Sequence, residues 1–292
     1  MRNTTLSLLL LISVLGFAKS ANPVKKSTID YYSNKPFNLG INKIPLGYNG
    51  VNPVQLFQNL IIRDGESKKS EFETTKQFES RTKNKELSPI IGNVYKDSLF
   101  AVSAKLTYYK LSPKYDADNG KMTIDIELDD YVGYKTESKY DRNKKIIELK
   151  TIEISHDRYT GSNVYGVKKI IDKYEDEQYS LQINNWESLY NIYKKEIYPT
   201  TISFSFEMDS NNAINMTNSI KVNKHKLGCL FIGKLIDPFM SIGYYYSGKA
   251  TIDDTNEFTT TYHYLHMFID EIWLYNKTTG KIYSKIKKQD KW

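Results

Sequence analysis

Cysteine is almost absent from this sequence, in which Cys229 is the only one among 292 residues. A single cysteine cannot form an intrachain disulfide, and the apolar run around it, LGCLFIG, is typical of a buried thiol. The folded state must therefore depend on a hydrophobic core, and the chain is long enough to form one.

Arginine is also scarce, although the chain is basic. Five arginines accompany a large excess of lysine, and the formal net charge is +7, or +5 without the first twenty residues. Proteins that read nucleic acids rely on the planar fork of arginine. We therefore expect a protein or an anionic envelope polymer as the partner, and not a nucleic acid.

Signatures of several enzyme and ion-binding classes are missing or broken. The sequence has no G-x-S-x-G nucleophile motif. Gly243–Ala250, GYYYSGKA, has the spacing of a phosphate-binding loop, but three tyrosines fill it and an alanine replaces the magnesium-binding hydroxyl. Asp116–Gly120, DADNG, is out of register for an EF-hand. We expect a tyrosine-rich strand or turn at the first segment and a hairpin loop at the second, where an irregular calcium loop is the alternative.

Two of the four histidines, His263 and His266, invite a metal interpretation. Their neighbours are mainly β-branched or aromatic, which favours a strand on which residues three apart point to opposite faces. We therefore predict no metal site and no cofactor. One imidazole is expected to pack beside Tyr264 and Phe268, and the other to lie with Leu265 or at the surface.

The first residues are typical of a cleaved secretory signal peptide, predicted for residues 1–20. Arg2 supplies a positive start, Leu6–Phe17 is apolar, and Ala18–Ser20 places small residues around a cleavage site. We expect a mature protein that begins near Ala21 and is periplasmic or secreted.

A second apolar stretch, Leu227–Tyr246, is interrupted by Lys234 and Asp237. Charged side chains are costly in a bilayer, so this stretch predicts a core segment and no transmembrane segment in the mature chain.

Residues 21–88 are expected to form an extended arm followed by helices. Asn52 is a good helix cap before VQLFQNLII, and Gly65 can end that helix. Glu66–Leu87 is strongly charged, which predicts either a solvated helix or a mobile linker.

Residues 89–292 predict a mostly antiparallel β domain, because apolar residues alternate with a period of two. Phe100–Tyr108 and Lys121–Leu128 are expected to pair as a hairpin across the loop SPKYDADNG, and Gly161 and Ser162 to turn the chain. The other predicted strands are 144–155, 164–172, 201–208, 220–222, 227–235, 258–275 and 281–287, with YNKTTGKIY closing the last hairpin.

One amphipathic helix is predicted near residues 185–198, where Trp186, Leu189, Tyr190 and Tyr193 share a face. A weaker helix is predicted at Asp209–Ser219. The expected fold class is therefore α+β, with a largely antiparallel sheet, one amphipathic helix packed on it and an N-terminal helical or extended segment.

The abundance of tyrosine, with 24 residues, gives the leading functional hypothesis. Tyrosine suits half-buried strand faces and contact surfaces alike. The predicted binding surface is a basic, tyrosine-rich sheet face of an exported, non-enzymatic protein, comprising Tyr244, Tyr245, Tyr246, Tyr262 and Tyr264.

Two alternatives accompany this hypothesis. Asp125, Glu127 and Asp129 alternate along one predicted strand face, as the carboxylates of a secreted or periplasmic hydrolase acting on glycans would. Asn215 and Asn276 head N-x-[ST] triplets, which would be acceptor sites in a eukaryotic secretory glycoprotein.

Overall fold

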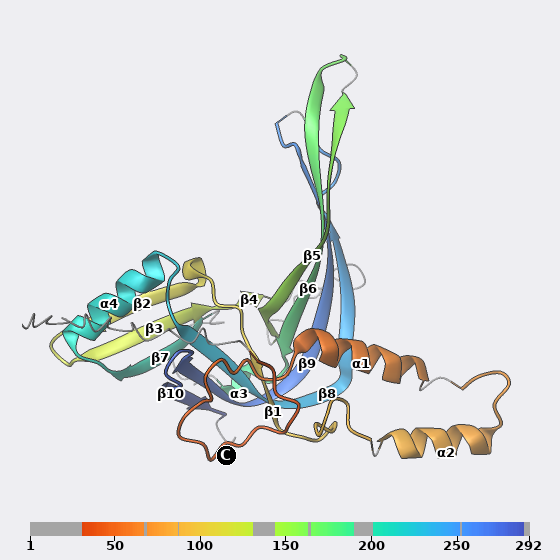
Figure 1. Cartoon of the computed structure of the whole chain (residues 1–292), viewed down its shortest axis with the longest axis horizontal. Coiled ribbons are helices and arrows are strands. Elements are labelled where there is room, and N and C mark those ends of the chain that lie inside the picture. Colours follow the sequence, from red (N-terminus) through yellow and green to blue (C-terminus); the bar gives the residue numbers. More distant parts are fainter. Residues whose placement is uncertain are drawn as a thin grey trace, which may run out of the picture.

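The computed structural model describes residues 31–66, 69–86, 88–130, 144–162, 165–189, 201–251 and 253–288. They form a β-rich fold with few helices, in which one large and one small sheet are both built mainly from antiparallel pairs (Figure 1). These features are compatible with the predicted α+β class. The predicted signal peptide lies outside the described residues.

The described helices are short and lie at the periphery of the sheets. They are α1 (Pro53–Glu66), α2 (Thr75–Glu86), the 3-10 turn η1 (Tyr108–Lys110), α3 (Trp186–Leu189) and α4 (Ser210–Lys221). Among the described residues, none of them has both the length and the apolar character needed to cross a membrane.

Seven strands form the large sheet. They are β1 (Phe100–Ser103), β4 (Asp129–Asp130), β5 (Lys145–Ser162), β6 (Lys168–Ile183), β8 (Leu227–Tyr246), β9 (Asn256–Asn276) and β10 (Ile282–Lys287). Their order is β1-β8-β9-β6-β5-β4, and β10 pairs with β9 beyond the end of β6. Every pair is antiparallel except β6–β9, because the chain crosses between these two strands through β7, α4 and β8.

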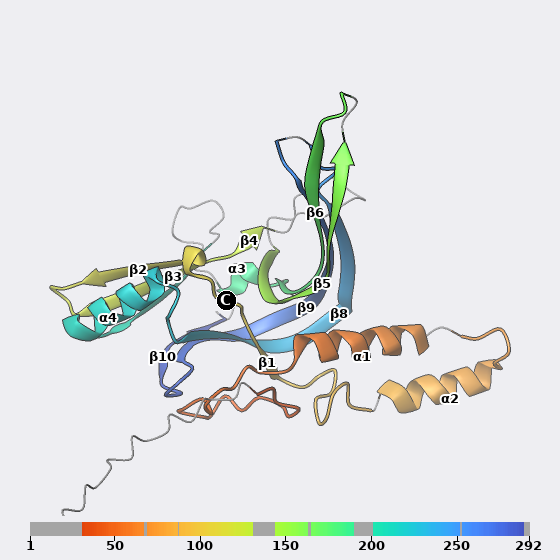
Figure 2. The ribbon, with the colours of Figure 1, turned by 45° about the horizontal axis from the view of Figure 1, so that its top comes forward.

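The small sheet has the order β2-β3-β7 and is covered by α4 (Figure 2). Its strands are β2 (Leu111–Asp116), β3 (Lys121–Glu127) and β7 (Thr201–Glu207). Apolar residues of β3 and β7 alternate as predicted and are buried against the helix and the core: Met122, Ile124, Ile126, Ile202, Phe204 and Phe206. Helix α4 begins where Asp209 accepts a hydrogen bond from the Asn212 backbone N–H at 2.9 Å.

The predicted hairpin between Phe100–Tyr108 and Lys121–Leu128 is wrong. β1 pairs with β8 of the large sheet, and the partner of β3 is β2, which occupies most of the predicted loop. The turn of the real hairpin is DADNG, where Gly120 has φ +59°. Lys114 and Tyr115, which were expected in the loop, lie in the edge strand β2, and an edge strand tolerates Pro113.

Two other predicted boundaries are also wrong. Gly161 and Ser162 continue β5 and do not turn the chain, so the β5–β6 hairpin is longer than predicted. Residues 220–222 were predicted as a strand, but Ile220 and Lys221 form the last turn of α4. In both places the local apolar pattern spans only a few residues. The pairing of β5 with β6 determines the structure at the first place, and the continuation of α4 determines it at the second.

The segment before β1 packs against the large sheet. Helix α1 begins as predicted, with Asn52 Oδ1 accepting from the Val54 N–H at 3.1 Å, and α1 buries Leu56 and Phe57 in the main core. Phe37 packs edge-on against Trp273 at 5.2 Å between ring centroids. Residues on both sides of position 88 therefore share the same cores.

The two remaining helix predictions have different outcomes. Within Glu66–Leu87 the structure contains α2, so the helical alternative is the correct one for Thr75–Glu86. The amphipathic helix near 185–198 is described only at α3, whose Trp186 and Leu189 are buried, and its remaining residues lie outside the described chain.

Candidate functional site

The predicted tyrosine cluster lies where β8 and β9 run far from the small sheet. The last three residues of β8 are Tyr244, Tyr245 and Tyr246, and they pair with Thr261, Thr260 and Thr259 of β9. The first part of the segment GYYYSGKA is therefore a tyrosine-rich strand, one of the two predicted alternatives.

The structure divides these tyrosines between the two faces of the sheet. Residues that pair directly across antiparallel strands share a face, so Tyr245 lies on the same face as Tyr262 and Tyr264. Tyr244 and Tyr246 lie on the opposite face, which α1 covers further along the sheet. The rings of Tyr262 and Tyr264 stack at 5.9 Å, and Tyr264 is only 6% exposed.

Other exposed apolar side chains gather at the same end of the sheet, which we call the aromatic end. It combines the ends of β5, β6, β8 and β9 that point away from the small sheet in Figure 1. Its exposed members are Tyr159, Tyr165, Ile170, Tyr244, Tyr245, Tyr246 and Phe258, among which Tyr165 is 88% and Tyr244 68% exposed.

Sequence reasoning missed the contribution of Tyr159, Tyr165, Ile170 and Phe258. The signal available was the alternation of residues that continues past Gly161, but the glycine was read as a turn. Only the register of β5 with β6, and of β6 with β9, brings these side chains next to the predicted tyrosines.

A buried carboxylate ties the aromatic end together. Glu257 on β9 is 8% exposed, and its Oε1 accepts hydrogen bonds from the Tyr159 hydroxyl at 3.1 Å and from the Ala250 N–H at 2.9 Å. Burial, followed by the bond to Glu257, raises the pKa of Tyr159, so its hydroxyl stays a donor. These bonds join β5, β9 and the β8–β9 loop into one support for the exposed rings.

An aromatic ladder crosses the aromatic end on the sheet face opposite to Glu257. His156 stacks on Tyr174 at 4.3 Å, and Tyr174 stacks on Phe258 at 5.2 Å, so one ring comes from each of β5, β6 and β9. Beside it, Asp172 Oδ1 accepts from Arg158 at 2.9 Å and lies 3.0 Å from His156 Nε2. Arg158 is the main cause of the lowered pKa of Asp172, and His156 adds to it.

The charge of this region differs from the predicted basic face. The four strands β5, β6, β8 and β9 carry eleven acidic and seven basic residues. Several of the cations form ion pairs on the strands, as Arg158 does with Asp172 and Lys173 with Glu175 at 2.6 Å. The surface of these strands thus combines aromatic rings with paired charges, and the excess of lysine lies elsewhere.

Both edges of the aromatic end are unpaired in the part of the chain that the structure describes. β1 pairs with β8 only at Leu230–Gly233, and β4 pairs with β5 only at Lys145 and Ile146. The ends of β8 and β5 therefore present backbone N–H and C=O groups on their outer edges.

The histidines of β9 lie on opposite faces, as predicted, and both are buried. His263 packs between Tyr179 at 4.5 Å and Phe57 at 4.6 Å, and His266 Nε2 lies 2.8 Å from the Ser241 hydroxyl. Of the two expected positions for the second imidazole, the surface position is not found, and buried His263 lies on the same face of β9 as Leu265. Burial lowers the pKa of His263, and it lowers the pKa of His266 to about 4.

The predicted carboxylates do not form one group. Asp125 on β3 accepts from Lys114 at 2.9 Å and from Ser203 at 2.6 Å, and Glu127 follows it on the same strand. Asp129 lies in β4 of the other sheet, paired with Lys110 at 2.5 Å. The strand-face alternation thus places Asp125 and Glu127 on the outer side of the small sheet, with Asp125 held by a lysine and a serine.

The loop DADNG is organised by its own side chains, since Asp116 accepts from the backbone N–H groups of Asp118 and Asn119. Cys229 is fully buried as predicted, and burial raises the pKa of its thiol. Within the described ranges, no three His, Cys, Asp or Glu side chains converge in a way that could hold a metal ion.

Comparisons with protein-family models, with curated proteins and with solved structures found no match to this chain.

Proposed function

We propose that this chain is an exported, non-enzymatic protein that binds a protein partner through the aromatic end of its large sheet. The observation that carries the proposal is the grouping of exposed rings from β5, β6, β8 and β9 on one supported sheet end. Large exposed apolar groups of this kind are uncommon on monomeric proteins and are typical of interaction sites.

The chemistry of the aromatic end favours a protein over an anionic polymer. Tyrosine is enriched at the centres of protein interfaces because its ring is rigid and its hydroxyl forms hydrogen bonds. An anionic polymer would need unpaired cations, whereas these strands carry more acidic than basic residues. The open edges of β5 and β8 also suit a partner that adds a strand.

The proposed export rests on the sequence of residues 1–20, with its charged start, apolar stretch and small residues at the cleavage site. Expression in a secreting host, followed by N-terminal sequencing of the protein outside the cytoplasm, tests it. A mature chain that begins near Ala21 is the expected result; an uncleaved chain retained in the cytoplasm would contradict it.

The binding proposal is tested by cosedimentation of the purified mature protein with cell-envelope fractions of its source. One set of fractions is treated with protease and washed, and each set is assayed at low and high salt. We expect binding to be lost after protease treatment and to persist at high salt, because the contacts are mainly apolar. Binding that survives protease and is released by salt would instead indicate an anionic polymer.

A matched pair of double variants locates the surface. Tyr244→Ser with Tyr246→Ser removes two exposed rings of the aromatic end, whereas Tyr108→Ser with Tyr109→Ser removes two exposed rings of η1. We expect the first variant to lose binding by about tenfold or more and the second to bind like the unmodified protein. Equal binding by all three proteins would exclude the aromatic end.

A further inference from the structure

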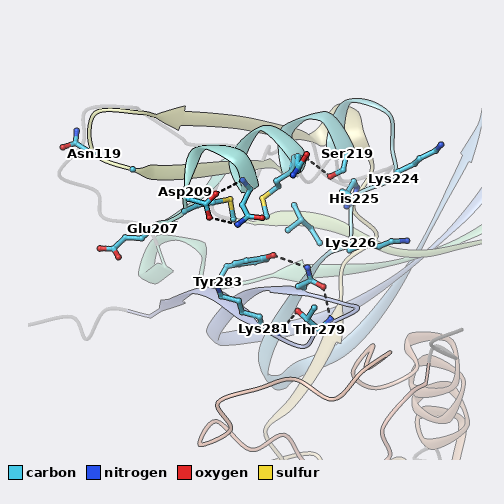
Figure 3. Close-up of a pocket in the computed structure, with 17 residues that line it drawn as sticks. Asn119, Glu207, Asp209, Ser219, Lys224, His225, Lys226, Thr279, Lys281 and Tyr283 are labelled. Carbon is cyan, nitrogen blue, oxygen red and sulfur yellow. Dashed lines mark hydrogen bonds between the residues drawn. The ribbon is translucent and has the colours of Figure 1, made fainter. Parts of the chain in front are cut away.

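A cavity of about 810 Å³ lies at the other end of the molecule, between α4, the end of β7 and the turn that joins β9 to β10 (Figure 3). It is within the size range of small-molecule sites, and it has room for a ligand with several polar groups. Its lining contains three lysines and two carboxylates. Lys224, His225 and Lys226 line the cavity from the segment after α4, and Lys281 and Tyr283 line it from the last hairpin.

The positive charge in the cavity is not neutralised by ion pairs. Among the described residues, Lys224, Lys226 and Lys281 have no carboxylate within ion-pairing distance, although Lys281 Nζ lies 5.7 Å from the ring centre of Tyr283. An uncompensated cluster of lysines in a concave site attracts anions, because the low-dielectric walls concentrate the field.

The acidic residues of the cavity lie at its opposite end. Figure 3 shows Glu207 and Asp209 on one side and Lys224, His225 and Lys226 on the other. The Asp209 carboxylate already accepts from the Asn212 backbone N–H at 2.9 Å and from the Asn212 side-chain amide at 2.5 Å, as the cap of α4. The cavity is therefore polarised, with Lys224, His225 and Lys226 away from the carboxylates, while Lys281 lies below Tyr283 on the side nearer to Asp209.

The β9–β10 turn, which lines one wall of the cavity, is held in place by Asn276. Its Oδ1 accepts from the N–H groups of Thr278 and Thr279, and its Nδ2 donates to the Tyr283 hydroxyl at 3.1 Å. The turn that carries Lys281 is thereby fixed before any ligand arrives, which reduces the entropy cost of binding. The same bonds engage the Asn276 side chain, which heads one of the N-x-[ST] triplets.

The pKa of His225 is sensitive to the positive charges around it in the cavity. Burial lowers the pKa of its imidazole, and the charges of Lys277 and Lys226 lower it further. Its Nδ1 is shielded from solvent and has no hydrogen-bond partner among the described residues. An anion bound beside these lysines would favour the imidazolium form of His225, and protonation would in turn favour the bound anion.

We propose that this cavity binds a small polyanion, whose clustered phosphate, sulfate or carboxylate oxygens contact Lys226, Lys281 and His225. The polar remainder of the ligand lies along α4, where Asn212 and Asn215 supply amide groups to the lining. This site is separate from the aromatic end and does not depend on the function proposed for it.

Calorimetric titration of the mature protein with three probes tests the proposal and separates the sources of the anion. Tripolyphosphate represents inorganic phosphate chains, trigalacturonate represents acidic saccharides, and maltotriose is the neutral control. We expect at least one anionic probe to bind and maltotriose not to bind. If tripolyphosphate and trigalacturonate both fail to bind, or if maltotriose binds as tightly as they do, the proposal is wrong.

Two variants distinguish the cavity from general attraction to a basic protein. Lys226→Gln with Lys281→Gln should weaken binding of the anionic probe by about tenfold or more, since charge-assisted hydrogen bonds are lost. Lys168→Gln with Lys169→Gln removes two exposed lysines of β6 and should leave the affinity within about twofold. Equal losses in both variants would indicate non-specific electrostatics and overturn the site.

The pH dependence of binding supplies an independent readout. Affinity for the anionic probe should increase as the pH falls from 8 to 6, and His225→Gln should remove that increase while preserving the affinity at pH 8. The other titratable groups that face His225 in the cavity are Lys224, Lys226, Lys281, Tyr283, Glu207 and Asp209, with Lys277 nearby. An unchanged pH profile in the His225→Gln variant would exclude His225 from the site.

Discussion

The Tyr159 hydroxyl donates a hydrogen bond to the buried Glu257 carboxylate at 3.1 Å, and this bond links β5 to β9 across the intervening strand β6. The same carboxylate oxygen accepts the Ala250 N–H from the loop after β8. The hydrogen bonds that hold together the strands and loop of the aromatic end thus depend on one acidic side chain, Glu257.

Glu257→Ala is expected to loosen the aromatic end without unfolding the protein. The change removes the acceptor of two partly exposed donors, the Tyr159 hydroxyl and the Ala250 N–H, at a cost of about 0.5–1.5 kcal/mol for each hydrogen bond. Hydrogen exchange of the Ala250 amide should become faster, while exchange in β3 and β7 stays the same. Tyr159→Phe is the milder comparison, because it removes only one of the two bonds. Unchanged exchange at Ala250 would show that Glu257 does not hold the loop.

Tyr264 and Tyr244 should differ in their effects on stability, although both belong to the predicted cluster. Tyr264→Ala removes a buried ring that stacks on Tyr262, at a cost of about 3–5 kcal/mol. Tyr244→Ala removes a largely exposed ring and should change the free energy of unfolding by less than about 0.5 kcal/mol. Urea unfolding of the two variants measures the difference, and equal effects would contradict the burial of Tyr264 or the exposure of Tyr244.

His266 should make the protein less stable as the pH falls from about 6.5 to 4. Its pKa is lowered to about 4 by burial, so the unfolded chain binds a proton in this range and the folded chain does not. The stability is complete above pH 6.5 and is lost as the pH decreases through the window, by up to about 3 kcal/mol.

Unfolding of His266→Gln at pH 7 and at pH 4.5 checks this effect, since the glutamine side chain can still bond to Ser241 but cannot titrate. The variant should lose less stability between these two pH values than the unmodified protein. Buried His263, whose pKa is also lowered, contributes in the same direction and remains in both proteins. Identical pH dependence would show that His266 titrates normally in the folded state.

Two glycine-to-alanine substitutions should change the free energy of unfolding in opposite directions. A Cβ at Gly233 would lie 2.1 Å from the Phe268 carbonyl oxygen, where β8 and β9 shift register, so Gly233→Ala is expected to cost about 1–3 kcal/mol or more. Gly65 lies in the last turn of α1 with open space around it, and Gly65→Ala should stabilise the protein by up to about 1 kcal/mol. Thermal unfolding of both variants is the measurement. A stabilising Gly233→Ala would contradict the close approach of the two strands.

The sequence predicted only the part of the candidate site that consists of neighbouring residues in one strand. Tyr244, Tyr245 and Tyr246 were expected on a strand or turn, because consecutive aromatic residues favour extended backbone. Which face each ring occupies could not be predicted, since it depends on the register of β8 with β9 across a shift between Leu235 and Met240. Tyr159 and Phe258 join the site only through pairings between strands distant in the sequence.

Short-range sequence signals specify several elements of this fold. Alternation in β3 and β7, the caps Asn52 and Asp209 and the turn of the last hairpin at Gly280 are each fixed by residues within a few positions of one another. Those signals predicted the class of fold and the burial of Cys229.

The order of the strands in the sheets depends on contacts between distant parts of the chain. The pairing of β1 with β8 and the parallel pairing of β6 with β9 join segments that no local pattern connects, because the free energy of these contacts comes from burying both sheet faces together. The same pairings place the tyrosines on two faces of one sheet end, and the packing of α4 beside the last hairpin gathers the lysines around the cavity at the other.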